Sequence, residues 1–229
     1  MFSTMLKSGY QHHADIVCCN YIQVDEEGHI SHTEHTGQEY VLNQDEALKA
    51  ILIKDKIYSQ CWTKTYNREM LELNHIRNTE GLKTEEDFIY NIQAFACSQI
   101  VTIVDKPLYL YTHRTKSLSK DYYRNHISQY IDNRILRLEL VDKIIHDKFP
   151  HLQEYSSYHC IFYYNELIGR VCLFPSIYHG KKIRKVISYI RNHSNVLFAY
   201  HDQLGFSKLG AFAIMYLPTS LYLYYRRRK

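Results

Sequence analysis

The sequence predicts an α/β fold for residues 1–119 and an all-helical tail for residues 120–229. Two observations predict this organisation. Up to about residue 119, short apolar runs typical of strands alternate with segments whose apolar residues follow the spacing of a helix. Residues 120–149 then contain neither Gly nor Pro, and their apolar residues recur every three or four positions.

The first predicted elements are a helix and a strand. Residues 1–10 have the spacing of an amphipathic helix. Residues 16–19 form a continuous apolar run, which is typical of a strand that is covered on both faces. A turn is expected at residues 26–29, and a weaker strand or hairpin follows up to about residue 40.

Two helices separated by an extended segment are expected next. Residues 43–55 carry a helical apolar stripe, and Asn43 is placed to cap the first turn. Residues 58–66 predict a short extended segment. Residues 67–76 predict another helix or helical turn.

Three consecutive carboxylates at positions 85–87 begin the next predicted helix. Thr84 is its expected N-cap, and acidic residues are common in the first turn of a helix. Residues 100–104 and 108–114 predict two strands, and the segment between them, which contains Pro107, predicts a turn.

The tail begins with one long helix that Pro150 ends. A second helix is expected to about residue 170, and a third follows a break at Pro175. The last segment, residues 209–225, has 17 residues without a charge and is followed by three Arg and one Lys. For this segment, the preferred interpretation is a helix that lies on a membrane surface. The alternative is a helix docked on its own domain, and a membrane-spanning helix is the least favoured.

The charge of the chain is distributed unevenly. From residue 181 to the end there are ten Lys or Arg and one acid, which predicts an anionic partner. We expect this partner to be a membrane surface, bound through residues 205–229, and not a nucleic acid, because the basic residues are interleaved with a long apolar run.

The cysteines and histidines bear on compartment and metal binding. The six cysteines include no CxxC pair and mostly lie in apolar runs, which indicates free thiols in a reducing compartment. The N-terminus has no signal-peptide pattern, so we expect a cytoplasmic protein, peripheral to the inner face of the cell membrane. The histidine-rich stretches at residues 12–13 and 29–35 lack the ligand spacing of a zinc site, and no metal site is expected there.

Four segments of the sequence occur in order: CWTKTYNREML, TEGLKTEEDFIYN, IVTIVDKPLYLYTHR and TKSLS. Their order and spacing resemble the second half of the catalytic domain of family 2 glycosyltransferases, of the bacterial type that builds capsule, exopolysaccharide or lipopolysaccharide. The resemblance implies part of a GT-A fold, a mostly parallel sheet flanked by helices, with a nucleotide-sugar site at the strand ends.

The same resemblance implies roles for individual residues. Asp87 corresponds to the general base that removes a proton from the acceptor hydroxyl, and Glu86 lies beside it. Trp62 is expected to offer a flat face to a sugar ring, with a core aromatic as the alternative. Three further residues are expected to contact phosphate or acceptor oxygens: Lys64, His113 and Arg114. The family often has another Arg where this chain has Thr112, and this difference weakens the expectation of a phosphate contact on this strand.

The resemblance also implies what this chain lacks. Intact family members hold a divalent metal, Mg or Mn, with a D-x-D motif that is expected upstream of Met1, so we expect no cofactor to be retained here. The chain is therefore expected to lack its donor-binding half, to bind nucleotide-sugar poorly and to be weakly active or inactive. The exposed sheet edge is expected to be covered by a second copy or a partner. The alternative function is a non-catalytic membrane-associated or partner-binding protein.

Overall fold

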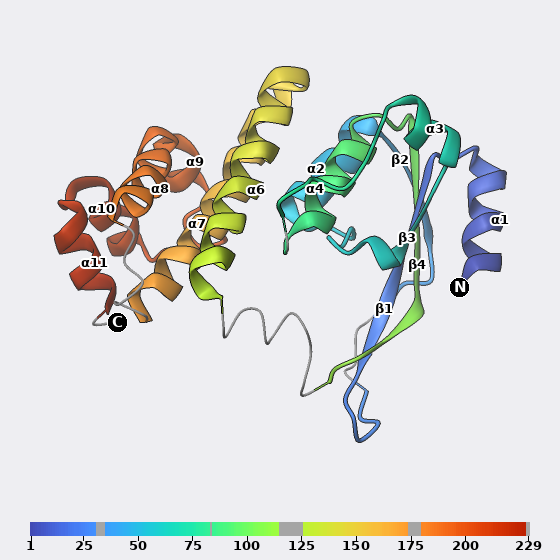
Figure 1. Ribbon diagram of the computed structural model, residues 1–229, viewed down its shortest axis with the longest axis horizontal. Coiled ribbons are helices and arrows are strands. Elements are labelled where there is room, and N and C mark those ends of the chain that lie inside the picture. The colour runs from blue at the N-terminus through green and yellow to red at the C-terminus, as the bar shows by residue number, and fades with distance from the viewer. Residues whose placement is uncertain (31–34, 83, 115–125, 174–179, 228–229) are drawn as a thin grey trace. The chain divides into compact units, whose positions relative to one another are not determined.

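The chain forms two compact units, Met1–His126 and Ile127–Lys229 (Figure 1). The first unit is α/β and the second is helical, which confirms the predicted fold class. The predicted boundary between residues 119 and 120 lies outside the described residues. The computed structural model describes the whole chain except residues 31–34, 83, 115–125, 174–179 and 228–229.

The first unit is built on a four-stranded mixed sheet. Its central pair, β1 and β4, is parallel, whereas β2 pairs with β4 and β3 pairs with β1 in the antiparallel sense. The described sheet is therefore mixed, and the expectation of a mostly parallel sheet holds only for its centre. In spatial order, the strands are β2 (Glu39–Asn43), β4 (Ile100–Thr112), β1 (Ile16–Val24) and β3 (Lys64–Tyr66).

β4 is one long strand, and the prediction of two strands joined by a turn was wrong. Cys19 of β1 pairs with Val104, but its neighbour Asn20 pairs with Pro107. The two residues between Val104 and Pro107 have no counterpart in β1, so they form a bulge. The bulge accommodates Asp105 and Lys106, and Pro107 resumes the pairing with β1, so the strand continues through the segment that suggested a turn.

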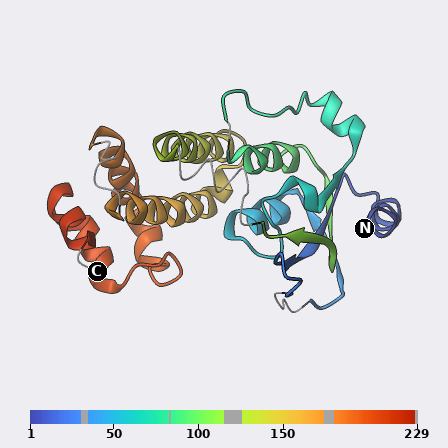
Figure 2. The same cartoon turned by 60° about the horizontal axis from the view of Figure 1, so that its bottom comes forward.

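Helices cover both faces of this sheet (Figures 1 and 2). On one face, Met5 of α1 is buried against Val17, Cys19 and Val104, while Phe2 and other large residues on the outer side of α1 are exposed. α2 and α4 lie on the opposite face (Figure 1). The helices of this unit are α1 (Phe2–His12), α2 (Gln44–Ile53), α3 (Arg68–Leu73) and α4 (Glu86–Phe95).

The helix starts confirm one predicted cap and correct another. The Asn43 side chain accepts a hydrogen bond from the Glu46 backbone N–H at 2.9 Å, and the Glu46 carboxylate accepts one from the Asn43 N–H at 2.9 Å, so α2 has a capping box. Thr84 is not the N-cap of α4. Glu85 takes that position with a φ of 73°, and its side chain makes no capping hydrogen bond.

The second unit consists of helices around one apolar core. α6 and α7 pack side by side, as Figures 1 and 2 both show. Pro150 begins a short 3-10 turn between them, which confirms the predicted end of the long helix. The predicted break at Pro175 lies outside the described residues. The helices are α6 (Ile127–Lys148), α7 (Gln153–Leu173), α8 (Gly180–Asn192), α9 (Ser194–Ala199), α10 (Lys208–Tyr216) and α11 (Thr219–Arg227).

The uncharged last segment forms two helices, α10 and α11, that meet at Pro218. Ile214, Tyr222 and Leu223 are buried in the core of the second unit, so the inner side of both helices docks on that unit. For the inner side of the two helices, this arrangement agrees with the alternative in which the last segment docks on its own domain. Within the described residues, no helix combines the length and the apolar character that crossing a bilayer requires.

Candidate functional site

Asp87 lies in the first turn of α4, directly after Glu86, and both residues are half-buried. Its Oδ2 accepts a hydrogen bond from the backbone N–H of Cys61 at 3.3 Å. A carboxylate at this end of a helix is stabilised by the helix dipole. Asp87 lies apart from the hollow between β2 and α2, which is lined by residues such as Tyr40 and Leu42.

Asn91, one turn further along α4, fixes this arrangement. Its side chain is fully buried and donates to the carbonyl oxygens of Ser59 at 2.7 Å and of Asp87 at 2.8 Å. It also accepts a hydrogen bond from the Tyr66 hydroxyl at 2.7 Å. One side chain thus ties the start of α4 to the loop before Cys61 and to β3. Sequence reasoning missed Asn91, because its role depends on contacts with distant segments.

Trp62 belongs to a half-buried group of aromatic rings, which we call the aromatic platform. Its ring stacks on Tyr111, with centroids 5.2 Å apart and 5° between the planes, and lies 4.4 Å from Tyr109. Tyr21 meets Trp62 edge-on at 4.9 Å. Tyr58 meets Tyr21 at 4.9 Å. Because Trp62 directly follows Cys61, the platform lies beside the residue that hydrogen-bonds to Asp87.

The platform depends on the parallel pairing of β1 and β4 and on the register that the two strands adopt after the bulge. Tyr21 of β1 pairs with Tyr109 of β4, and the next alternate residue of β4 is Tyr111. Alternate residues of a strand point to the same face, so both β4 tyrosines reach Trp62. Trp62 was predicted as a site residue from the resemblance, whereas these tyrosines were not predicted. Their alternate spacing in a strand was the available signal.

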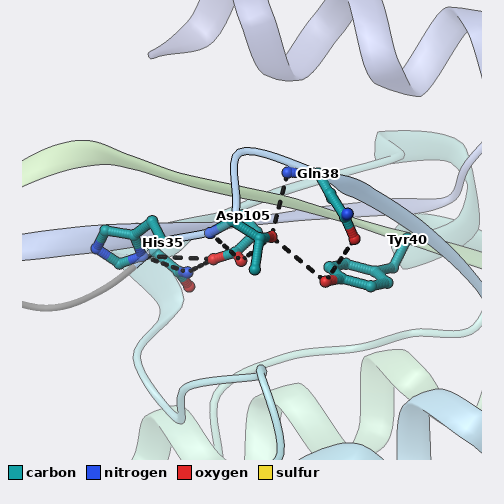
Figure 3. A network of polar contacts seen from close by, with 6 residues as sticks. His35, Gln38, Tyr40 and Asp105 are labelled. Carbon is teal, nitrogen blue, oxygen red and sulfur yellow. Dashed lines mark hydrogen bonds and ion pairs between the residues drawn. The ribbon is translucent and has the colours of Figure 1, made fainter.

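The bulge is held by a buried polar network around Asp105 (Figure 3). Its carboxylate accepts hydrogen bonds from the Thr36 backbone N–H at 2.9 Å, from the Thr36 hydroxyl and from the Asn20 amide. His35 lies 3.3 Å from the same carboxylate. Burial alone raises the pKa of Asp105, but the hydrogen bonds from Thr36 and His35 outweigh it and lower the pKa below its ordinary value. Asp105 is therefore a charged group that fixes the bulge.

Lys64 has a structural position in this site. It is buried, and its ammonium donates to the carbonyl oxygens of Tyr58 at 2.5 Å and of Gln60 at 2.8 Å, and to the Thr63 hydroxyl at 3.3 Å. Burial lowers its pKa, although nearby groups such as Cys18 oppose the shift. Three acceptors match the three donors of an ammonium. Lys64 therefore holds the loop that carries Trp62, which differs from the expected contact with phosphate or acceptor oxygens.

His113 and Arg114 directly follow β4 and are exposed. The His113 backbone N–H donates to the carbonyl oxygen of Val24 at 2.7 Å, and its ring meets Tyr111 edge-on at 5.4 Å. His113 therefore extends the platform at its open end. A contact of either residue with a substrate stays a prediction.

The described residues do not provide a metal site that fits beside Asp87. The group whose side chains converge as metal ligands is Asp25, Glu27 and His29, in the turn after β1. Hydrogen bonds within that turn account for the convergence: the Asp25 carboxylate accepts from the backbone N–H groups of Glu27 at 2.9 Å and His29 at 2.8 Å. We therefore derive no chemical step through a metal held by this chain.

No protein-family model matches this sequence. Among curated proteins, the chain is 22% identical over 198 residues to the uncharacterized glycosyltransferase EpsJ of Bacillus subtilis strain 168. The aligned region covers 82% of this chain and 56% of EpsJ. Among solved structures, residues 1–349 of S. aureus TarS in complex with UDP-GlcNAc give a TM-score of 0.53 at 14% identity, covering 99% of this chain and 61% of that one. A second structure of the same TarS segment gives a TM-score of 0.50 at 13% identity, covering 99% and 60%.

These comparisons relate the chain to glycosyltransferases. The sequence similarity is to a glycosyltransferase, and the shared fold is that of a protein whose structure holds UDP-GlcNAc. The chain spans 56% of the length of EpsJ and 61% of the TarS segment 1–349.

Proposed function

We propose that this chain provides the base and the acceptor-binding surface of a family 2 glycosyltransferase of GT-A fold. The reaction is the transfer of a sugar from a nucleotide-sugar donor to a saccharide or lipid-linked acceptor in cell-surface polysaccharide synthesis. The observation that carries the proposal is the position of Asp87, which is fixed at a helix start beside the aromatic platform. The similarity to EpsJ and the fold shared with TarS support it.

Asp87 acts as the general base in this proposal. The acceptor hydroxyl donates its hydrogen to the carboxylate, and its oxygen forms a bond with the anomeric carbon of the donor. The bond from that carbon to the diphosphate breaks, and the nucleoside diphosphate leaves with the electron pair. General base catalysis of this kind contributes about 10²–10⁴ in rate. Glu86 lies beside Asp87 and adds negative charge at the helix start.

The aromatic platform positions the acceptor. One side of a sugar ring presents C–H groups and packs against flat aromatic faces, while its hydroxyls remain available for hydrogen bonds. Trp62 and Tyr111 provide such faces, and the hydrogen bond from the Cys61 N–H ties Asp87 to the segment that carries Trp62, which supports this arrangement. The acceptor hydroxyl nearest Asp87 is the one that reacts.

The donor in this proposal is a nucleotide-sugar, by analogy with the UDP-GlcNAc held by TarS. A divalent metal, Mg or Mn, would neutralise the leaving diphosphate when bound. We expect weak donor binding and weak turnover by this chain. Calorimetry with UDP- and GDP-sugars and manganese tests this expectation, and micromolar binding with rapid turnover would contradict it.

The fluorescence of Trp62 tests acceptor binding independently of the donor. Trp62 is the one tryptophan of the chain, so its emission reports on the platform alone. We expect oligosaccharides to change this emission in a saturable way, and Tyr111→Ala to weaken the effect several-fold. Nucleotides alone should have little effect.

The competing candidate is a non-catalytic protein that binds a partner. It would retain the fold but show no saccharide-dependent change at Trp62 and no sugar transfer with any donor in the panel. Both results together would favour it over the enzyme.

A further inference from the structure

The outer side of α10 is apolar. Leu209, Phe212 and Tyr216 are 65%, 53% and 73% exposed, and their spacing of three and four places them on one side of the helix. The Phe198 ring of α9 lies 5.4 Å from Phe212, and the Phe212 ring stacks on Tyr216 at 6.1 Å. We call these four residues the α10 stripe. The opposite side of α10, which includes Ala211 and Ile214, is buried.

Folding of the second unit does not require the α10 stripe to be apolar, because its side chains face outward. Scattered single apolar residues are normal on a protein surface, whereas a contiguous group marks an interaction site. The rings of the stripe contact one another, so they form a contiguous group.

Basic residues outnumber acidic ones in the part of the sequence that carries the α10 stripe. Residues 201–229 contain five Lys or Arg and one acid, Asp202, which is exposed in the turn before α10, and residues 127–229 contain 15 Lys or Arg and seven acids. Lys208 is exposed at the first position of α10. At the other end, the Arg191 guanidinium donates to the carbonyl oxygens of Ile214 at 2.7 Å and of Leu217 at 2.5 Å. One end of the stripe therefore carries the exposed Lys208, and the other end carries the hydrogen-bonded Arg191.

This combination fits an anionic lipid surface better than a second copy of the chain. A symmetric contact through the stripe would place each Lys208 and Arg191 near basic residues of its mate, and residues 201–229 hold one acid, Asp202, to offset them. Aromatic and leucine side chains beside Lys and Arg are the residues that favour the membrane–water interface. The inner leaflet of the cell membrane supplies the negative charge.

We propose that the α10 stripe docks this protein on the cytoplasmic face of an anionic membrane. The helix lies along the surface, with Phe212 and Tyr216 at the level of the headgroups and Lys208 and Arg191 against lipid phosphates. This inference is independent of sugar transfer. It narrows the expected membrane-binding segment, residues 205–229, to one side of α10.

The test is co-sedimentation of the whole chain with vesicles. We expect binding to phosphatidylcholine vesicles that contain phosphatidylglycerol, weaker binding to phosphatidylcholine alone, and weaker binding at high salt. The double variant Phe212→Ser/Tyr216→Ser should lose about tenfold or more in affinity. The matched control is Tyr10→Ser/Leu73→Ser, which removes side chains of similar exposure, 79% and 80%, from the first unit and should bind like the wild type.

Three results would overturn the proposal. One is the absence of binding to the anionic vesicles, and another is equal loss in the control variant. The third is a dimer in sedimentation velocity that the Phe212→Ser/Tyr216→Ser variant dissolves, without vesicle binding by the wild type. Circular dichroism establishes that each variant is folded, and Leu209→Ser provides a second variant of the α10 stripe with the same expected direction.

Discussion

Asn91→Leu is expected to destabilise the first unit and to loosen Asp87 from the aromatic platform. The substitution removes two donated hydrogen bonds, to the carbonyl oxygens of Ser59 and Asp87, and one accepted from the Tyr66 hydroxyl. The side chain is fully buried, so water does not replace these bonds. With about 1 kcal/mol for each bond, and partner groups left unsatisfied, the expected loss in the free energy of unfolding is about 2–4 kcal/mol.

Urea unfolding followed by Trp62 fluorescence measures this loss. Trp62 is the one tryptophan and lies in the first unit, so the signal does not report on the helical unit. A loss of this size lowers the midpoint by about 1–2 M urea. Asn74→Leu is the matched control, because Asn74 is exposed and makes one side-chain bond, to the Met70 carbonyl oxygen at 2.8 Å. A shift no larger than that of the control would refute the reasoning.

Three further perturbations have expected outcomes. Burial raises the pKa of Glu166, but Arg134 and Arg170 outweigh burial and lower the pKa below the ordinary 4.5. Glu166→Gln should therefore be less stable than the wild type at neutral pH. In denaturation assays, this difference in the free energy of unfolding should shrink as the pH falls below 4.5. Burial raises the pKa of the Cys18 thiol to about 11 and of Cys160 to about 12, so mass spectrometry of the native protein should show neither alkylated by iodoacetamide near neutral pH. Asn43→Ala removes the cap of α2 and should cost about 1 kcal/mol in urea unfolding; an unchanged midpoint would contradict it.

Elements with strong local signals were predictable from the sequence. The apolar run at the start of β1, the capping box of α2 and the Pro150 that follows α6 each depend on neighbouring residues. Local patterns could not predict the continuity of β4. The bulge depends on Asp105, whose partners Thr36 and Asn20 are far away in the sequence. A polar residue before a proline predicts a turn unless such contacts are known.

The candidate site was predictable in part. The resemblance pointed to Asp87 and Trp62. In the structure, the backbone N–H of Cys61, the residue before Trp62, donates a hydrogen bond to the Asp87 carboxylate. The tyrosines of the platform were missed because they meet across strands whose register the sequence does not reveal. Lys64 has a different role from the expected one, because its long side chain reaches carbonyl oxygens of its own loop.

The most direct test of the account is sugar transfer by the wild type, Asp87→Asn and Glu86→Gln, with millimolar nucleotide-sugar, manganese and an oligosaccharide acceptor, and with mass spectrometry to detect the product. We predict slow product formation by the wild type, a loss of about 10²-fold or more in Asp87→Asn, and a change within about threefold in Glu86→Gln. Product formation by Asp87→Asn at the wild-type rate would contradict the claim that Asp87 activates the acceptor.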